Sequence, residues 1–184
     1  MWHFNDNNDE SYANDRLRKI SPLIKKLNQK FEEVLTPGTN VCIDETMVPF
    51  RGCLIFKQFL KNKHHKFGIK LYKLCTEKGY TYNIRVYSGT DALETGSASQ
   101  RVVIEMMNGL LDCGRTLFTD KYYTSVVLAT ELLERKTHLV GTIRSNRKFN
   151  SNAVVAKKLQ KYEIFAQEAT TAQLCSSGRT REMS

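Results

Sequence analysis

The chain has 184 residues, enough for one domain with a sizeable hydrophobic core and few for two. Hydrophobic residues make up 41% of it and aromatic residues 10%, with three prolines, a composition that excludes wholesale disorder. There are 28 basic and 19 acidic side chains, which gives a formal net charge of +9. This positive charge favours a polyanionic partner such as nucleic acid, and the alternative is a basic face exposed to solvent.

Residues 17–34 are expected to form an amphipathic helix, because apolar side chains recur there at three- and four-residue spacing. The pair Ser21-Pro22 interrupts the pattern, either as an N-cap followed by Pro at the first helical position or as a kink. The stretch "TPGTN" then breaks the chain before "VCID", residues 41–44. We expect "VCID" to be a short buried strand that ends at the acidic pair Asp44-Glu45.

Residues 67–87 alternate between two faces and predict a β-hairpin, with "TEKG" as its turn. Residues 99–111 return to helical spacing. Two methionines in this helix, Met106 and Met107, are expected to fill the core and not to act as ligands.

A second short strand, "TLFTD", also ends on an acid, Asp120. Thr124 or Ser125 is expected to cap the helix that follows, and "HLVGTIR" at 138–144 is expected to be a further strand. The order is helix, strand, hairpin, helix, strand, helix, strand, which predicts a mixed α/β domain without an internal repeat.

Five cysteines are scattered without the paired spacing of a zinc site: Cys42, Cys53, Cys75, Cys113 and Cys175. We expect them to be reduced, mostly buried thiols in a cytosolic or nuclear protein. The first ten residues do not resemble a signal peptide, and no apolar run approaches the roughly 20 residues that span a bilayer. No membrane partner is therefore expected.

Asp44 and Asp120 are the candidate metal ligands, because both follow short strands and adjacent strand ends can bring two carboxylates together. Paired oxygen ligands suit Mg²⁺, and two-metal phosphoryl transfer uses them to clamp the attacking and leaving oxygens. The alternative for either residue is an ordinary helix cap or turn former.

Two long blocks resemble the catalytic domain of piggyBac-type transposases. The first is "TPGTNVCIDETMVPFRG" followed by "KQFLKNKHHKFGIKLYKLC", where the family has an Asp-Glu pair, a Phe-Arg-Gly and an "NKPxKxGxK" segment. The second is "TLFTDKYYTSVVLATELLERKTHLVGTIRSNRK", which matches strand, Asp, aromatic-Thr-Ser, helix and "GTxRxN". The resemblance covers roughly residues 10–165.

The resemblance implies an α/β fold with an incomplete RNase H-like mixed sheet and flanking helices. It also implies that three carboxylates hold two divalent ions, Mg²⁺ or Mn²⁺, that cut and rejoin DNA at transposon ends. Asp44 matches the first catalytic Asp and Asp120 the second, as metal ligands that activate water or a DNA 3′-hydroxyl. Glu45 belongs to the motif as a supporting acid.

The chain departs from the family pattern in three places. Lys121 stands where the family prefers Asn, so a cation directly follows Asp120. This cation is expected either to weaken metal binding or to face a DNA phosphate. His64 stands where the family often has Pro, and with His65 it is expected to be solvated or to face phosphate. The third catalytic Asp, in a stretch resembling "GGVDxxD", has no match in the 184 residues, nor do the family's long N-terminal region and cysteine-rich C-terminal domain.

The resemblance divides the chain into a helical lead-in at 1–40, a partial RNase H-like catalytic domain at 41–165 and a divergent tail at 166–184. The family's next strand commonly carries a Trp-Lys-Asp-Lys-Arg run. A suitable choice of codons for Leu174 to Ser184 encodes such a run in another reading frame, so we interpret the tail as translated out of frame.

Nine basic residues are expected to contact DNA phosphates, giving salt-dependent and largely sequence-independent affinity: Arg51, Lys57, Lys61, Lys63, Lys66, Lys70, Arg144, Arg147 and Lys148. Tyr122 or Tyr123 is expected to stack on an unpaired base and the other to lie in the core.

Three hypotheses for function follow from the sequence. The chain is a truncated, catalytically inactive derivative of a cut-and-paste transposase, or a domesticated non-catalytic module that binds DNA or protein. The third is a fragment whose missing Asp lies in neighbouring exons. A nuclear location is inferred from the family.

Overall fold

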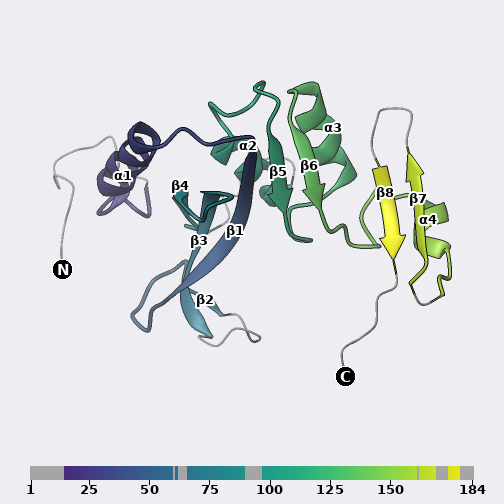
Figure 1. The fold of residues 1–184 in the computed structure, drawn as a ribbon. Coiled ribbons are helices and arrows are strands. Elements are labelled where there is room, and N and C mark those ends of the chain that lie inside the picture. The colour runs from purple at the N-terminus through teal and green to yellow at the C-terminus, as the bar shows by residue number, and fades with distance from the viewer. Residues whose placement is uncertain are drawn as a thin grey trace.

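The computed structural model describes residues 15–59, 61, 66–89, 97–160, 162–168 and 174–178, the last range by its backbone only. Within these residues, six strands form one mixed sheet at the centre of the molecule (Figure 1). They are β1 Asn40–Pro49, β2 Gln58–Phe59, β3 Phe67–Thr76, β4 Thr81–Val86, β5 Thr116–Thr119 and β6 His138–Gly141. Their order is β2-β3-β1-β5-β6, with β4 also paired to β3. β3 runs antiparallel to β1 and β4, whereas β1, β5 and β6 are parallel.

Strand β1 corrects one expectation from the sequence. The strand does not end at the acidic pair but continues through Asp44 and Glu45 to Pro49. The reason is its pairing with β3, which extends along the whole strand from Val41 to Pro49. Pairing with β5 on the other side stops at Ile43, so Asp44 lies within a strand but just past the end of its parallel partner.

The predicted hairpin is confirmed as β3 and β4. Their pairing is antiparallel, with one register shift between Leu74 and Cys75. The predicted turn contains Gly79, whose φ of 81° is a left-handed conformation that glycine adopts without steric cost. The alternation of side chains between two faces was therefore sufficient to predict this hairpin.

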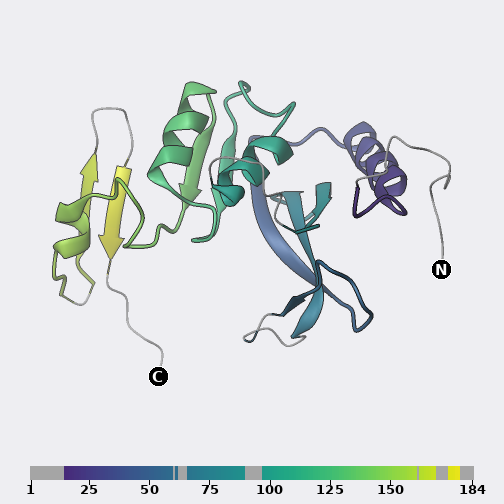
Figure 2. The same ribbon diagram turned by 180° about the vertical axis from the view of Figure 1, so that it is seen from behind.

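Helices α2, Ala98–Met106, and α3, Val126–Glu134, complete the core, and Figure 2 shows them in front of the sheet when it is seen from behind. Their apolar side chains pack on residues of the central strands, including Ile43, Leu74 and Leu117. Met106 and Met107 are 2% and 0% exposed, which confirms that they fill the core. Ser125, not Thr124, is the N-cap of α3, because its hydroxyl accepts a hydrogen bond of 3.1 Å from the amide of Leu128.

Helix α1, Ser21–Val34, begins four residues later than the periodicity predicted. Its N-cap is Ile20 and not Ser21, and Pro22 lies in the first turn, where it does not interrupt the helix. The helix lies against the outer edge of β4, where the side chain of Asn28 accepts a bond of 3.0 Å from the Ile84 amide and donates one of 2.9 Å to its carbonyl. These two bonds satisfy backbone groups that an edge strand would otherwise leave open to pairing.

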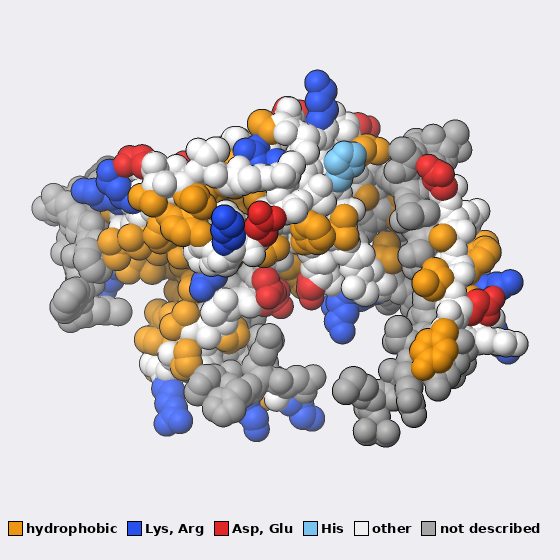
Figure 3. All heavy atoms as spheres, viewed as in Figure 1, with side chains coloured by type: hydrophobic (Ala, Val, Ile, Leu, Met, Phe, Trp, Pro, Cys, Tyr) orange, Lys and Arg blue, Asp and Glu red, His pale blue; other side chains and the backbone are white. Residues whose placement is uncertain are grey.

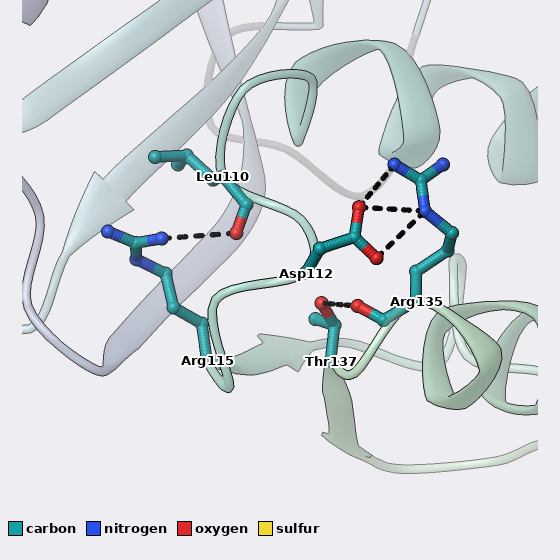
Figure 4. Close-up of polar contacts among 5 residues, drawn as sticks. All are labelled: Leu110, Asp112, Arg115, Arg135 and Thr137. Carbon is teal, nitrogen blue, oxygen red and sulfur yellow. Dashed lines mark hydrogen bonds and ion pairs between the residues drawn. The ribbon is translucent and has the colours of Figure 1, made fainter.

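Two arginines tie together the loops that enter the parallel strands (Figure 4). Arg115 donates to the carbonyls of Gly38 and Leu110, each at 3.1 Å, and so joins the entry to β1 to the loop before β5. Arg135 makes a bidentate ion pair with Asp112, at 2.6 Å for the closest contact, and joins that same loop to the entry of β6. The paired guanidinium lowers the pKa of the Asp112 carboxyl.

The rest of the described chain comprises α4, Asn152–Ala156, and an antiparallel pair of strands, β7 Ile164–Glu168 and β8 Leu174–Gly178. A bond of 2.6 Å from the Ser151 hydroxyl to the Gln167 side chain joins the start of α4 to β7. β7 crosses the boundary placed at 165/166, and the three-part division of the chain stays a prediction.

The cysteines are less buried than expected. Cys42 and Cys75 are half-buried and Cys53 and Cys113 are exposed, all four as free thiols, while the side chain of Cys175 lies outside the described residues. In the part of the chain that the structure describes, no helix is long and apolar enough to cross a membrane.

Candidate functional site

The strand register brings Asp44 and Asp120 together. β1 and β5 are parallel, and their last paired residues are Ile43 and Thr119. Asp44 is the next residue of β1 and Asp120 directly follows β5, and neighbouring strands lie only about 4.8 Å apart. Both carboxylates are exposed to solvent. The arrangement is an acidic pair at the carboxyl end of β5, and its two residues are separated in the sequence by the whole hairpin and α2.

Asp120 also forms the turn that follows β5. Its carboxylate Oδ1 accepts a bond of 2.8 Å from the amide of Tyr122, and its carbonyl accepts bonds from the amides of Tyr123 and Thr124 at 3.2 and 3.1 Å. The Thr124 hydroxyl donates to the same carbonyl at 2.8 Å. The turn-forming role and a ligand role are therefore compatible, because one carboxylate oxygen fixes the side chain and the other is not used by the turn.

Asp44 is surrounded by different contacts. Its Oδ1 accepts a bond of 2.7 Å from the amide of the next residue, Glu45. Lys73 of β3 is its cross-strand partner in the register, so an opposite charge lies directly across the strand pair. The sequence did not single out Lys73, because only the register of β3 against β1 shows which of the many lysines faces Asp44.

Glu45 accepts a hydrogen bond of 3.2 Å from the hydroxyl of Tyr123. Tyr123 is 1% exposed and belongs to the core, whereas Tyr122 is half-buried. Burial is the main cause that raises the pKa of Tyr123 well above its usual range, and the neighbouring negative charge of Glu45 adds to it. The prediction that one tyrosine of the pair lies in the core holds for Tyr123.

Two of the predicted phosphate-binding residues meet beside Asp120. The ammonium of Lys70 lies 4.8 Å from the ring centre of Tyr72 and 4.4 Å from that of Tyr122. The Nη2 group of Arg147 donates a bond of 2.6 Å to the carbonyl of Tyr122, while its buried Nε has no protein partner. Two cations from distant segments therefore contact Tyr122, two residues after Asp120.

The remaining basic residues of the predicted set lie in two regions of the sequence, 51–66 and 144–148. Lys57 donates 3.0 Å to the carbonyl of Gly52. Lys63 lies outside the described residues. The exposed members of the predicted set are Arg51, Lys61, Lys66, Arg144 and Lys148. Figure 3 shows acidic side chains near the middle of the face that carries β1 and β5, and Lys and Arg side chains along the rim below β2 and β3.

The donor chemistry fits a hard divalent cation. Mg²⁺ is commonly held by one or two protein carboxylates, with water and substrate phosphates as its other ligands. Asp44 and Asp120 supply two such carboxylates, and Arg147 contacts the turn after Asp120, where it can attract a phosphate. Lys70 contacts the ring of Tyr122 but lies on the face of the sheet opposite to Asp44. Among the described residues, no group of three or more His, Cys, Asp or Glu side chains is arranged to hold a metal ion.

Comparisons with known proteins agree with this architecture. A family model described as "Transposase IS4" matches residues 1–184. The chain is 30% identical over 154 residues to human "PiggyBac transposable element-derived protein 2" and 28% identical over 138 residues to human "PiggyBac transposable element-derived protein 3". These matches cover 79% and 72% of this chain, but only 25% and 23% of the two human proteins.

A solved structure has a similar fold. It is described as the cryo-EM structure of a piggyBac transposase synaptic complex with hairpin DNA. The TM-score is 0.81 at 22% sequence identity, and the match covers 95% of this chain and 40% of that one.

Proposed function

This chain belongs to the Transposase IS4 family, in its piggyBac branch, and on that premise we propose that it binds DNA and a divalent metal ion without cutting DNA by itself. Its sheet is RNase H-like, and the chain is related to cut-and-paste DNA transposases. It spans about a quarter of the length of the human relatives. The activity of those longer proteins is therefore a proposal for this chain and not an inherited fact.

The register that places Asp44 beside Asp120 is the observation that carries the proposal. Their carboxylates are the ligands for Mg²⁺ or Mn²⁺, and Arg147, which contacts the turn after Asp120, holds the DNA phosphate next to them. The bound ion would supply charge neutralisation at the phosphate and acidify a water molecule or a DNA 3′-hydroxyl. The turn bonds of Asp120 keep one ligand in place before the ion arrives.

The absence of cleavage is proposed from the sequence. The family resemblance implies three catalytic carboxylates, and these 184 residues contain matches for two. Lys121 adds a positive charge directly after Asp120, which opposes the binding of a cation. We therefore expect weak metal binding and no assembled pair of ions in these residues alone.

A nuclease assay tests this proposal. The purified chain is incubated with duplex DNA that carries a piggyBac-type transposon end, in Mg²⁺ or in Mn²⁺. We expect no strand cleavage above that of the Asp44→Asn variant. Cleavage that the Asp44→Asn substitution abolishes would contradict the proposed lack of activity, and would mean that the chain is a working nuclease.

The second candidate is a domesticated module whose function is binding alone, in the nucleus, to DNA or to another protein. The exposed basic residues of the two regions favour DNA as the partner. This candidate does not need the metal ion. Equal affinity for duplex DNA in Mg²⁺ and in excess chelator would favour it over the first proposal.

A further inference from the structure

We infer that Tyr123 is a positioning residue that sets the separation of Asp44 and Asp120, through its hydrogen bond to Glu45. The inference rests on the proposed metal site and assigns to it a pair of residues that do not touch the ion. Tyr123 lies in the turn that begins at Asp120, and Glu45 directly follows Asp44 on β1. The bond therefore joins the two segments that carry the carboxylates.

The ring of Tyr123 is held firmly to the Asp120 turn. Its amide donates a bond of 3.2 Å to the Asp120 carbonyl, and its side chain is 1% exposed. The ring packs edge-to-face against Tyr72 and Tyr122, with ring centres 6.3 and 4.9 Å away. A buried ring in such contacts has little freedom to rotate, so the position of its hydroxyl follows the position of the turn.

The bond acts where the backbone no longer holds the two strands together. The parallel ladder between β1 and β5 ends at Ile43 and Thr119. Beyond that point β1 pairs with β3 alone, so its distance from the Asp120 turn is no longer fixed by backbone bonds to β5. The Tyr123–Glu45 bond of 3.2 Å joins the two segments beyond that point, two residues after Ile43 on β1 and four residues after Thr119. This side-chain hydrogen bond connects the two segments where backbone hydrogen bonds between β1 and β5 have ended.

The alternation of the strand explains how Glu45 can do this without entering the site. Successive side chains of a strand point to opposite faces of the sheet. Glu45 lies on the same face as Ile43 and is turned toward the core tyrosine, while Asp44 projects from the other face. The hydrogen bond from Tyr123 to Glu45 thus fixes the position of the backbone at Asp44 and leaves the Asp44 carboxylate available to an ion.

The experiment measures Mn²⁺ binding from the electron paramagnetic resonance signal of the free ion, on the full 184-residue chain. Tyr123→Phe removes only the hydroxyl, and Tyr72→Phe is the matched control, because it removes a buried hydroxyl from the same aromatic cluster and leaves the hydrogen bond between Tyr123 and Glu45 in place. Loss of a supporting hydrogen bond typically weakens metal binding about 10-fold or more. We expect Tyr123→Phe to raise the Mn²⁺ dissociation constant by about that factor, and Tyr72→Phe to leave it within about 2-fold.

Substitutions of Glu45 separate a positioning role from a ligand role. Glu45→Gln keeps an oxygen that accepts the tyrosine hydrogen bond and is expected to retain most of the affinity, whereas Glu45→Leu is expected to lose as much as Tyr123→Phe. The double variant Tyr123→Phe with Glu45→Leu should be no worse than either single change, because both remove the same bond. If Glu45→Gln binds Mn²⁺ as poorly as Glu45→Leu, Glu45 is itself a ligand and the inference is wrong.

Two further variants distinguish a failure of the inference from a failure of the proposed function. Asp44→Asn and Asp120→Asn must each abolish Mn²⁺ binding if the site exists. If they do, and Tyr123→Phe binds like the wild type, the positioning role is overturned and the site remains. If neither Asp variant changes Mn²⁺ binding, both the proposed metal site and the inference are wrong. Should Tyr123→Phe be poorly folded by circular dichroism, the comparison of Glu45→Gln with Glu45→Leu decides the question.

Discussion

At the scale of single residues, the carboxylate pair is exposed but the groups that hold it in place are buried. Asp120 is anchored by its own turn, and Glu45, next to Asp44, is anchored by Tyr123. Tyr72 and Tyr123 are 4% and 1% exposed and belong to the hydrophobic core. Burial is the first cause that raises the pKa of both tyrosines, because it disfavours the charged phenolate.

Alkaline pH should therefore destabilise the protein. A tyrosine whose pKa is higher in the folded state contributes stability below the unfolded-state pKa of about 10, and that contribution is lost as the pH rises above it. We expect the urea midpoint to fall between pH 9 and pH 11, and less steeply for Tyr123→Phe than for the wild type. If all eight tyrosines ionise together near pH 10 in the folded protein, followed at 295 nm, the pKa of Tyr123 is not raised.

Residue-scale features of the site were partly predictable. Asp44 and Asp120 were found because each follows an apolar run, and the family resemblance gave them a role. The bond from Tyr123 to Glu45 was not predictable, because it joins residues 78 positions apart and depends on the register of two strands. The one available signal was the double tyrosine after Asp120, which indicated that one ring is buried.

At the scale of elements, periodicity identified the hairpin and the two core helices but not the length of α2 or β1. Helix α2 ends at Met106, five residues before the predicted end at Leu111, and β1 is longer than predicted. The apolar run stops at Ile43, whereas backbone pairing with β3 continues for six more residues, Asp44 to Pro49, whose side chains are exposed or half-buried. The start of α1 was missed in the same way. The apolar spacing begins at Leu17, but residues 15–20 form turns tied by the Asp15 side chain, which accepts from the Leu17 amide at 2.7 Å.

The contact between β6 and the Asp120 turn depends on Gly141. A Cβ at this position would lie 2.4 Å from the Thr124 hydroxyl and 2.5 Å from the Thr119 carbonyl. Gly141→Ala should therefore displace the turn and lower the free energy of unfolding by about 1–3 kcal/mol. Gly38→Ala is the control, because a Cβ there meets no atom within 4 Å. Equal urea midpoints for the two variants would show that the close approach at Gly141 is not structurally important.

At the scale of the whole molecule, a net charge of +9 is combined with acidic side chains near the middle of one face (Figure 3). Exposed basic residues lie between β1 and β3 and in the segment after β6, whereas Asp44 and Asp120 belong to β1 and to the end of β5, which lie between β3 and β6 in the order of the sheet. Positive charge of this kind attracts a phosphate backbone irrespective of its sequence. The carboxylate pair would then lie where the backbone passes.

DNA binding should accordingly depend strongly on salt. If about five phosphates are contacted, the logarithm of the affinity should fall with the logarithm of the salt concentration with a slope of roughly −4 to −5. Lys66→Gln should reduce the slope by about one, since it removes one contact. Lys30→Gln is the matched control, because Lys30 is exposed on α1, away from the predicted interface, and pairs with Glu33. A salt-independent affinity would contradict a phosphate-binding surface.

The proposed function requires that Asp44 and Asp120 form one divalent-metal site. Calorimetric titration measures this, with Mn²⁺ added to the wild type, Asp44→Asn, Asp120→Asn and the double variant in the presence of duplex DNA, which supplies phosphate ligands. We expect one weak site in the wild type, its loss in either single variant, and no further change in the double variant. Binding that survives both substitutions would show that the two carboxylates, though adjacent, do not share an ion.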